Sequence, residues 1–278
     1  MRSVSKLDSR IPFGLNIDSN QLVDVGSVER GSACRCVCPS CRTPLIARQG
    51  TQNAWHFAHR SQDTHNETVK ECDFSFAFSV RLMIRQLATH GLQLKVPKLE
   101  GSFSAYCEHT YQAQNFDYQV TEERVLTLDD IQVGVVFAGE TVDVLGYIGS
   151  VPFVVHVTYR ERKLPAGLCS PAISKCGVIE INVDDLPELF ELERKGQYQE
   201  VLRKYIEEQT EGKNWAYHPR EQRLMNIAMQ ERDLWLKQQK VAANINKSAH
   251  YTCRICGWMG PTITCEVCKS HLYTSNKI

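Results

Sequence analysis

The 278-residue chain has no net charge, no long apolar run, no low-complexity tract and no internal repeat. Its 32 Lys and Arg residues balance its 32 Asp and Glu residues, so the total charge does not indicate a polyanionic partner or a membrane surface. No window approaches the run of about 18 apolar residues that a membrane span requires. The N-terminus is charged and lacks the apolar run of a signal peptide. We therefore expect a globular, cytoplasmic protein with no membrane partner.

The charge is nevertheless unevenly distributed along the chain. Residues 1–62 carry 8 basic and 4 acidic side chains, residues 63–210 carry 14 and 23, and residues 211–278 carry 10 and 5. Two basic ends therefore flank an acidic middle. Since contacts to a phosphate backbone come mainly from Lys and Arg, the ends are the parts that favour a polyanion.

Eight of the twelve cysteines form two groups, one near each end of the chain. In a reducing compartment, such clustering indicates metal binding rather than disulfides. The groups are Cys34, Cys36, Cys38 and Cys41, and then Cys253, Cys256, Cys265 and Cys268.

The C-terminal group consists of two Cys-x-x-Cys pairs separated by eight residues. Tetrahedral zinc takes four thiolates, and a two-residue gap lets one tight turn present two sulfurs. So short a tail has almost no core and needs such a staple. Cys253, Cys256, Cys265 and Cys268 therefore predict a structural zinc ribbon. Zinc ribbons bind DNA, RNA or protein, or hold a terminus folded, so the function of this one stays open.

The N-terminal group combines Cys38 and Cys41 with His56 and His59, across a predicted hairpin of strands at 44–48 and 53–57. Two thiolates and two imidazoles form a closed structural zinc site, and Cys36 is the alternative ligand. The gap between the histidines is too short for a DNA-reading zinc finger, and no recognition helix precedes them.

Hydrophobic periodicity predicts the elements that follow. We expect helices at 74–87 and 220–241, one or two helices at 186–207 with a break near Gly196, and strands at 92–96, 124–128, 134–137, 141–148, 151–159 and 178–183. The predicted domains are an N-terminal zinc module (1–62), an α/β core (63–210), a helical linker (211–245) and the four-cysteine ribbon (246–278).

Three short segments resemble the N-terminal zinc-binding segment of the competence protein CoiA-like family: Cys38-Pro-Ser-Cys41, Pro44-Leu-Ile-Ala-Arg48 and Trp55-His-Phe-Ala-His59. The resemblance implies an α/β fold with a PD-(D/E)xK restriction-endonuclease-like core between two small zinc-binding modules, the C-terminal ribbon being an addition. It also implies processing or handling of DNA during natural transformation.

A PD-(D/E)xK site places one acid on a strand and an acid and a lysine, two residues apart, on the next strand. The acids hold Mg²⁺ and the lysine activates water. Asp143 fits the first acid, while His156 and Thr158 occupy the acid and lysine positions. Neither is what the motif requires, so the metal site is altered or inactive.

Other residues compensate for the missing ligands in this hypothesis. Glu180 on the following strand and Asp73 at the start of the first helix are the candidate metal ligands, and we expect Glu180 and His156 within about 8 Å of the Asp143 carboxylate. Candidates for the displaced cation are Arg81, Lys163 and Lys175. The literal triplet Glu161-Arg162-Lys163 is more typical of a solvated charge cluster.

Two function classes remain open at this stage. One is a DNA-processing, CoiA-like protein, in its enzymatic form a Mg-dependent deoxyribonuclease with a degenerate motif. The other is a non-catalytic, zinc-dependent adaptor that binds DNA or protein partners. In the first case, Asp143→Ala should abolish cleavage with little loss of stability. The sequence does not indicate an oligomeric state.

Overall fold

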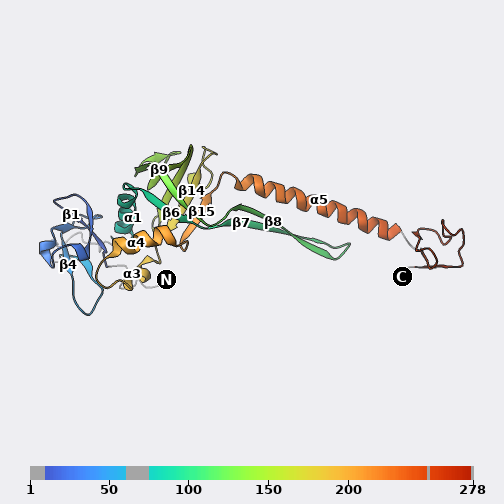
Figure 1. Cartoon of the computed structure of the whole chain (residues 1–278), viewed down its shortest axis with the longest axis horizontal. Helices are drawn as coiled ribbons and strands as arrows, with labels where there is room; N and C mark the ends of the chain where they lie inside the picture. The colour runs from blue at the N-terminus through green and yellow to red at the C-terminus, as the bar shows by residue number, and fades with distance from the viewer. Residues whose placement is uncertain (1–9, 61–74, 249–250, 277–278) are drawn as a thin grey trace. The chain divides into compact units, whose positions relative to one another are not determined.

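The computed structural model describes residues 10–60, 75–248 and 251–276 (Figure 1). The chain divides into two compact units, residues 1–99 with 121–219 and residues 100–120 with 220–278. The first unit is a mixed α/β structure built on a six-stranded sheet. The second unit contains a β-hairpin, a long helix and the C-terminal ribbon.

The first unit begins with two small antiparallel sheets. Strand β1 (Phe13–Asn16) pairs with β2 (Leu22–Asp24) and β3 (Cys36–Val37). The predicted hairpin is present as β4 (Leu45–Arg48) and β5 (His56–His59), with Leu45 opposite His59. Its second strand starts three residues later than expected, because residues 49–55 form the turn region between the strands.

The six-stranded sheet has the order β15-β14-β13-β12-β9-β6. Strands β13 and β14 run parallel, and all other neighbours are antiparallel. The bounds are Leu92–Val96 for β6, Arg124–Val133 for β9, Val144–Ile148 for β12, Val151–Thr158 for β13, Gly177–Asn182 for β14 and Lys213–Tyr217 for β15. A short hairpin of β10 (Val136–Phe137) and β11 (Glu140–Thr141) precedes β12.

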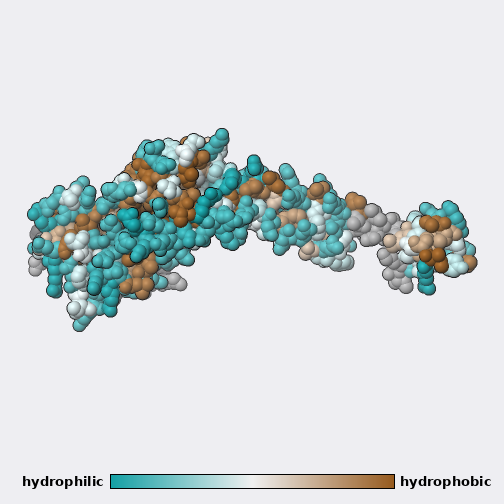
Figure 2. Space-filling model, viewed as in Figure 1, coloured by the Kyte–Doolittle hydropathy of each residue, from teal (hydrophilic) through white to brown (hydrophobic). Residues whose placement is uncertain are grey.

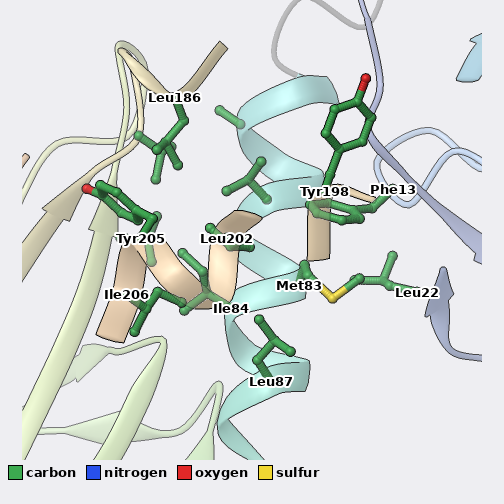
Figure 3. Packing of buried hydrophobic residues seen from close by; sticks show 14 of the residues in the cluster. Phe13, Leu22, Met83, Ile84, Leu87, Leu186, Tyr198, Leu202, Tyr205 and Ile206 are labelled. Carbon is green, nitrogen blue, oxygen red and sulfur yellow. The ribbon is translucent and has the colours of Figure 1, made fainter. Parts of the chain in front are cut away.

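Helices α1 (Ser75–Ala88) and α4 (Tyr198–Glu208) cover one face of this sheet. Figure 3 shows Met83 and Ile84 of α1 close to Leu202 of α4, together with aromatic side chains that include Tyr198. Strand residues alternate between the two faces, as a period of two requires. The helix-covered face buries Val144, Val155, Val157, Ile179 and Ile181, and the other face packs Leu145, Val154 and Val178 against α2 (Ala166–Cys169).

A buried lysine connects the sheet to the end of α4. Lys213 begins β15 and is 2% exposed. Its Nζ atom, which has at most three N–H donors, lies 2.6 to 3.1 Å from the carbonyl oxygens of Lys95, Tyr205, Ile206 and Gln209. The last carbonyls of a helix have few partners within the helix, and this side chain supplies donors to them. Burial lowers the pKa of Lys213 to about 7.

The second unit has its own small core. Strands β7 (Leu99–Cys107) and β8 (Gln112–Thr121) form a hairpin, and α5 spans Glu221–Ser248. Phe116 of the hairpin meets Trp235 of α5 edge to face, with ring centroids 6.0 Å apart. None of the described helices combines the length and the apolar composition needed to cross a bilayer.

The ribbon contains three short strands, with β16 between the other two. They are β16 (Tyr251–Cys253), β17 (Met259–Gly260) and β18 (Thr274–Asn276), all antiparallel.

Candidate metal centres and the Asp143 site

Three Cys-x-x-Cys turns in this chain share one backbone geometry, and we call each of them a knuckle. In each, the N–H of the first cysteine donates to the carbonyl five residues ahead, at 2.8 to 3.0 Å. The residue after the second cysteine has a positive φ, which turns the chain back tightly. The knuckles are Cys38–Cys41 followed by Arg42 (φ 63), Cys253–Cys256 followed by Gly257 (φ 72), and Cys265–Cys268 followed by Lys269 (φ 55).

The two C-terminal knuckles face each other. The four sulfur atoms lie within 4.8 Å of one another. Cys253 Sγ is 3.9 Å from Cys268 Sγ, and Cys256 Sγ is 3.4 Å from Cys265 Sγ. Tetrahedral zinc with bonds of about 2.3 Å to sulfur needs ligand atoms about 3.8 Å apart. This cluster is therefore geometrically suited to zinc.

The N-terminal knuckle gathers with one of the two predicted histidines. The ligand atoms of Cys38, Cys41 and His59 lie within 4.8 Å of one another. Cys41 Sγ is 3.3 Å from His59 Nε2, which also fits a shared tetrahedral zinc. Strand β5 carries His59 opposite Leu45 of β4, so the hairpin delivers the imidazole to the knuckle.

His56 is not part of this group. Residues 56 and 59 are three apart on one strand, and an odd separation puts their side chains on opposite faces. The Nδ1 atom of His56 is 2.9 Å from the carbonyl oxygen of Ala54. Burial lowers the pKa of His56 below its ordinary value. The structure thus brings together three of the four predicted ligands of this site.

Cys36, the alternative ligand, also lies outside the group. Its thiol is buried and donates to the carbonyl oxygen of Cys34 at 3.1 Å. The Cys34 thiol in turn donates to the carbonyl oxygen of Leu45 at 3.3 Å. Burial raises the pKa of Cys36 to about 12, so the thiol stays protonated. Both cysteines act as packing residues beneath the knuckle.

Residues 27–66 match the family model of the competence protein CoiA, N-terminal domain. The match contains the knuckle, the hairpin and both histidines, and it confirms the resemblance that the sequence predicts for this segment. It covers 40 of the 278 residues and does not include the six-stranded sheet. No curated protein and no solved structure matches the chain. We call residues 27–66 the CoiA-like segment.

Beyond the CoiA-like segment, Asp143 lies at the end of the β12–β13 pairing, next to Val144. The residue precedes β12, and its N–H donates to the carbonyl of Val155 at 3.2 Å. The next ladder position is taken by the side chain, because the N–H of Val157 donates to Asp143 Oδ2 at 2.8 Å. The carboxylate is 0% exposed.

Three guanidinium groups surround this carboxylate. Asp143 Oδ1 accepts from Arg81 Nε at 2.6 Å and from Arg85 Nε at 2.8 Å. Oδ2 accepts from Arg162 Nη1 at 2.8 Å, in addition to the Val157 N–H. A carboxylate offers about four lone-pair directions, so these four donors use its acceptor capacity.

The electrostatics agree with this arrangement. Burial by itself would raise the pKa of Asp143. The guanidinium groups of Arg162 and Arg81 and the Val157 N–H lower it by more, so the pKa lies below its ordinary value. Asp143 is ionised at neutral pH. A metal ion at Asp143 would therefore compete with three cations already in place.

The remaining predicted core residues lie on the adjacent strands. His156 of β13 is directly beside Glu180 of the parallel strand β14. The hydroxyl of Thr158 donates to Glu180 Oε1 at 2.6 Å. Neither His156 nor Glu180 joins Asp143 in a group of three ligand atoms within 4.8 Å, among the residues the structure describes. Asp73 lies outside the described residues.

His156 is buried and neutral. It is 2% exposed, and its Nδ1 is 3.5 Å from Arg162 Nη2. Burial first, and then the positive charge of Arg162, lower the pKa of His156 to about 4. A neutral imidazole is a poor ligand for Mg²⁺, which prefers carboxylate oxygen.

The sequence indicates Arg81 as a displaced cation, gives no role to Arg85, and places Arg162 in a solvated charge cluster, whereas the structure pairs Arg162 with the buried Asp143. Arg85 lies four residues after Arg81 on α1, and this spacing puts both side chains on one helix face, a signal that is visible in the sequence. Arg162 ends a tight turn that begins at Tyr159, and the two residues exchange backbone hydrogen bonds of 3.1 and 2.8 Å. The turn directs Arg162 back to the end of β13, which no local pattern indicates.

Proposed function

We propose that this protein handles DNA as a zinc-stabilised binding protein with a nuclease-like core that does not cut DNA at Asp143. The observation that carries the proposal is the combination of a CoiA-like segment with an Asp143 carboxylate whose acceptor positions are taken by arginines and a backbone N–H. The first supports a role in handling DNA. The second argues against Mg²⁺ chemistry at this carboxylate.

The core supports the PD-(D/E)xK-like interpretation in its topology. Strands β12 and β13 form an antiparallel pair, and β14 adds in parallel beside β13, with α1 and α4 packed on the sheet. Asp143 directly precedes β12, and His156 and Thr158 lie on β13. The lysine position carries a threonine, whose hydroxyl is engaged with Glu180, so it supplies no cation for water activation.

Zinc is the ion we assign to both clusters. Thiolates with or without one imidazole are ligands that zinc prefers over Mg²⁺ or Ca²⁺, and the ligand spacings suit a tetrahedral ion. A bound zinc would hold the knuckles closed and keep each module folded. Its role in this proposal is structural, so the residues around the modules make the contacts with DNA.

The N-terminal assignment is tested with the two histidines of β5. We expect His59→Ala to lose one equivalent of zinc, because its imidazole lies with Cys38 and Cys41. His56→Ala is the matched control on the opposite strand face, and we expect it to retain both equivalents. Elemental analysis of the purified proteins measures the difference. Loss of zinc in His56→Ala with retention in His59→Ala would contradict the assignment.

DNA binding is expected to depend on the basic ends and on salt. Each neutralised phosphate releases counterions, so affinity should fall steeply between about 50 and 200 mM salt. We expect the double variant Arg254→Gln and Lys269→Gln, which lowers the ribbon's charge, to bind single- or double-stranded DNA more weakly and with a shallower salt slope. Lys204→Gln on α4, in the acidic middle of the chain, is the control and should bind as the wild type does. Fluorescence anisotropy with labelled oligonucleotides measures both quantities.

The same oligonucleotides separate binding from cleavage. With Mg²⁺ present, we expect intact DNA after incubation with the wild-type protein. Mg²⁺-dependent cleavage that disappears in Glu180→Gln would instead establish the Mg-dependent deoxyribonuclease. If the protein does not bind DNA at low salt, the proposed function is wrong, and the zinc modules would then be protein-interaction elements.

A further inference from the structure

The Asp143 centre contains more positive than negative charge. Arg81, Arg85 and Arg162 contact one carboxylate, so the described residues of the centre carry a net charge of +2 at neutral pH. The neighbouring His156 is neutral and does not change this sum. Charged side chains that are largely buried are normally paired with opposite charge. The imbalance indicates that the centre is complete only with an anion.

The hydrogen-bond inventory points the same way. Each guanidinium has five N–H donors, whereas the Asp143 carboxylate has about four acceptor positions, one of which is used by Val157. Arg85 Nη2 is buried 2.7 Å from Asp143 Oδ1, yet it makes no hydrogen bond of acceptable geometry within the described structure. The carbonyl oxygen of Val157 also accepts from Arg162. Even with this acceptor, the guanidinium N–H donors of the centre outnumber its acceptors.

His156 adds another donor without an acceptor. Its Nδ1 faces Arg162 Nη2, which can only donate, so Nδ1 acts as the acceptor and the proton of the neutral ring is on Nε2. Nε2 is buried and has no hydrogen-bond partner among the residues the structure describes. Unpaired buried polar atoms are rare in folded proteins and call for an explanation.

The arginines are held in position but are not sealed off. Asp143 holds all three, and the tight turn at Tyr159 fixes Arg162. Gly134, with φ +64, lies so close to Arg85 that a Cβ there would be 3.0 Å from Nη1. The side chains of Arg81, Arg85 and Arg162 remain 13%, 18% and 18% exposed, while Asp143 is 0% exposed. Solvent therefore reaches the guanidinium groups but not the carboxylate.

We propose that Arg81, Arg85 and Arg162, assembled on Asp143, form a metal-independent binding site for one phosphate group. Planar guanidinium groups match the oxygen pairs of a phosphate, and a charge of +2 matches a phosphate monoester and exceeds the single charge of one diester. In a metal-dependent site the acid would hold Mg²⁺ for this purpose. Here the acid organises three arginines that contact the phosphate directly. That the phosphate belongs to DNA rests on the proposed function, whereas the site itself does not.

Inorganic phosphate is the probe that tests the site itself. Titration calorimetry at constant ionic strength, with chloride as the reference anion, should detect binding of phosphate to the full-length protein. We expect Arg85→Gln to weaken that binding about tenfold or more, since a charge-assisted contact is lost. Arg203→Gln on α4 removes the same charge from a surface pair with Glu207 and should leave phosphate affinity unchanged. Arg81→Gln is the second variant, used if circular dichroism shows Arg85→Gln to be unfolded.

Two oligonucleotide arms identify the source of the phosphate. A 5′-phosphorylated strand that binds more tightly than its 5′-hydroxyl counterpart, with the difference lost in Arg85→Gln, supports a terminal phosphate. Equal weakening of both strands in Arg85→Gln supports an internal diester. The proposed phosphate site is wrong if the protein does not bind phosphate, or if Arg85→Gln and Arg203→Gln bind it equally well. This holds even if DNA still binds elsewhere. Phosphate binding without any DNA binding keeps the site and rejects the proposed function.

Discussion

Replacing Asp143 with asparagine should lower the free energy of unfolding of the first unit by about 3 to 5 kcal/mol, the range measured when one partner of a buried ion pair is removed. The substitution preserves size and leaves three guanidinium groups without their common counter-ion. The amide also presents an NH₂ group to at least one of the donors that now contact the carboxylate. Urea unfolding followed by circular dichroism measures the loss.

Asp129→Asn is the matched control, because it makes the same chemical change at an exposed position of β9. We expect its effect to be within about 0.5 kcal/mol of zero. The sequence predicts that Asp143→Ala abolishes cleavage with little loss of stability. Because Asp143 is buried among three arginines, we instead expect its replacement to lower stability strongly. Equal midpoints for Asp143→Asn and the wild type would show that the three contacts contribute nothing to the fold.

Acidification should reproduce part of this loss in the wild type. The folded pKa of Asp143 lies below its ordinary value, so its contribution is present above about pH 4 and is lost as the pH falls through the folded pKa. The stability difference between the wild type and Asp143→Asn should therefore shrink below about pH 4. Comparing this pair isolates Asp143 from Asp24, whose pKa burial raises to about 7 and which acts in the opposite direction.

The parts of the candidate sites that sequence predicts well are local. Two cysteines separated by two residues specify a knuckle because the turn is completed within six residues, as the hydrogen bonds from Cys38, Cys253 and Cys265 show. The hairpin and the helix at α1 follow for the same reason, since their patterns lie within one element. His56 and His59 lie three residues apart on one strand, so the period of two puts them on opposite faces and only one of them can reach the knuckle.

Features that depend on distant segments could not be predicted in this way. Asp143 fits a metal ligand by its position on a strand, yet its partners come from α1 and from the turn after β13, which are separated from it by 62, 58 and 19 residues. Lys213 is a buried charged residue type at the start of β15, a position explained by its contacts with carbonyls at the end of α4. The β7–β8 hairpin is polar along most of its length, so hydrophobic alternation gave no signal for it.

These differences change what the core can do. In a metal-dependent nuclease, the acid on β12 has free acceptor positions directed at a cation, and a lysine on β13 assists the nucleophile. In this chain, the acid is enclosed by cations and the lysine position is a hydroxyl paired with Glu180. Under the proposed function, such a core binds phosphate without hydrolysing it, and the phosphate titration and the cleavage assay together test this combination.

The second large effect is expected in the C-terminal ribbon when its metal is removed. Of residues 251–276, the buried ones are Cys253, Gly260 and Cys265, two of which belong to the metal cluster. Figure 2 shows hydrophobic surface over the ribbon, and its exposed side chains include Ile255 and Leu272, at 65% and 74%. So little burial cannot offset the conformational entropy lost on folding.

Zinc must therefore supply the folding free energy of the ribbon, as in small zinc modules where the metal contributes roughly 10 to 16 kcal/mol. We expect Cys265→Ser to reduce zinc from two equivalents to one and to unfold residues 251–276, with the six-stranded sheet intact. Cys169→Ser changes an exposed cysteine outside both clusters and should retain two equivalents. Elemental analysis gives the stoichiometry, and hydrogen exchange with mass spectrometry should show loss of protection confined to the ribbon. A Cys265→Ser protein with two zinc ions and a protected ribbon would exclude four-cysteine coordination.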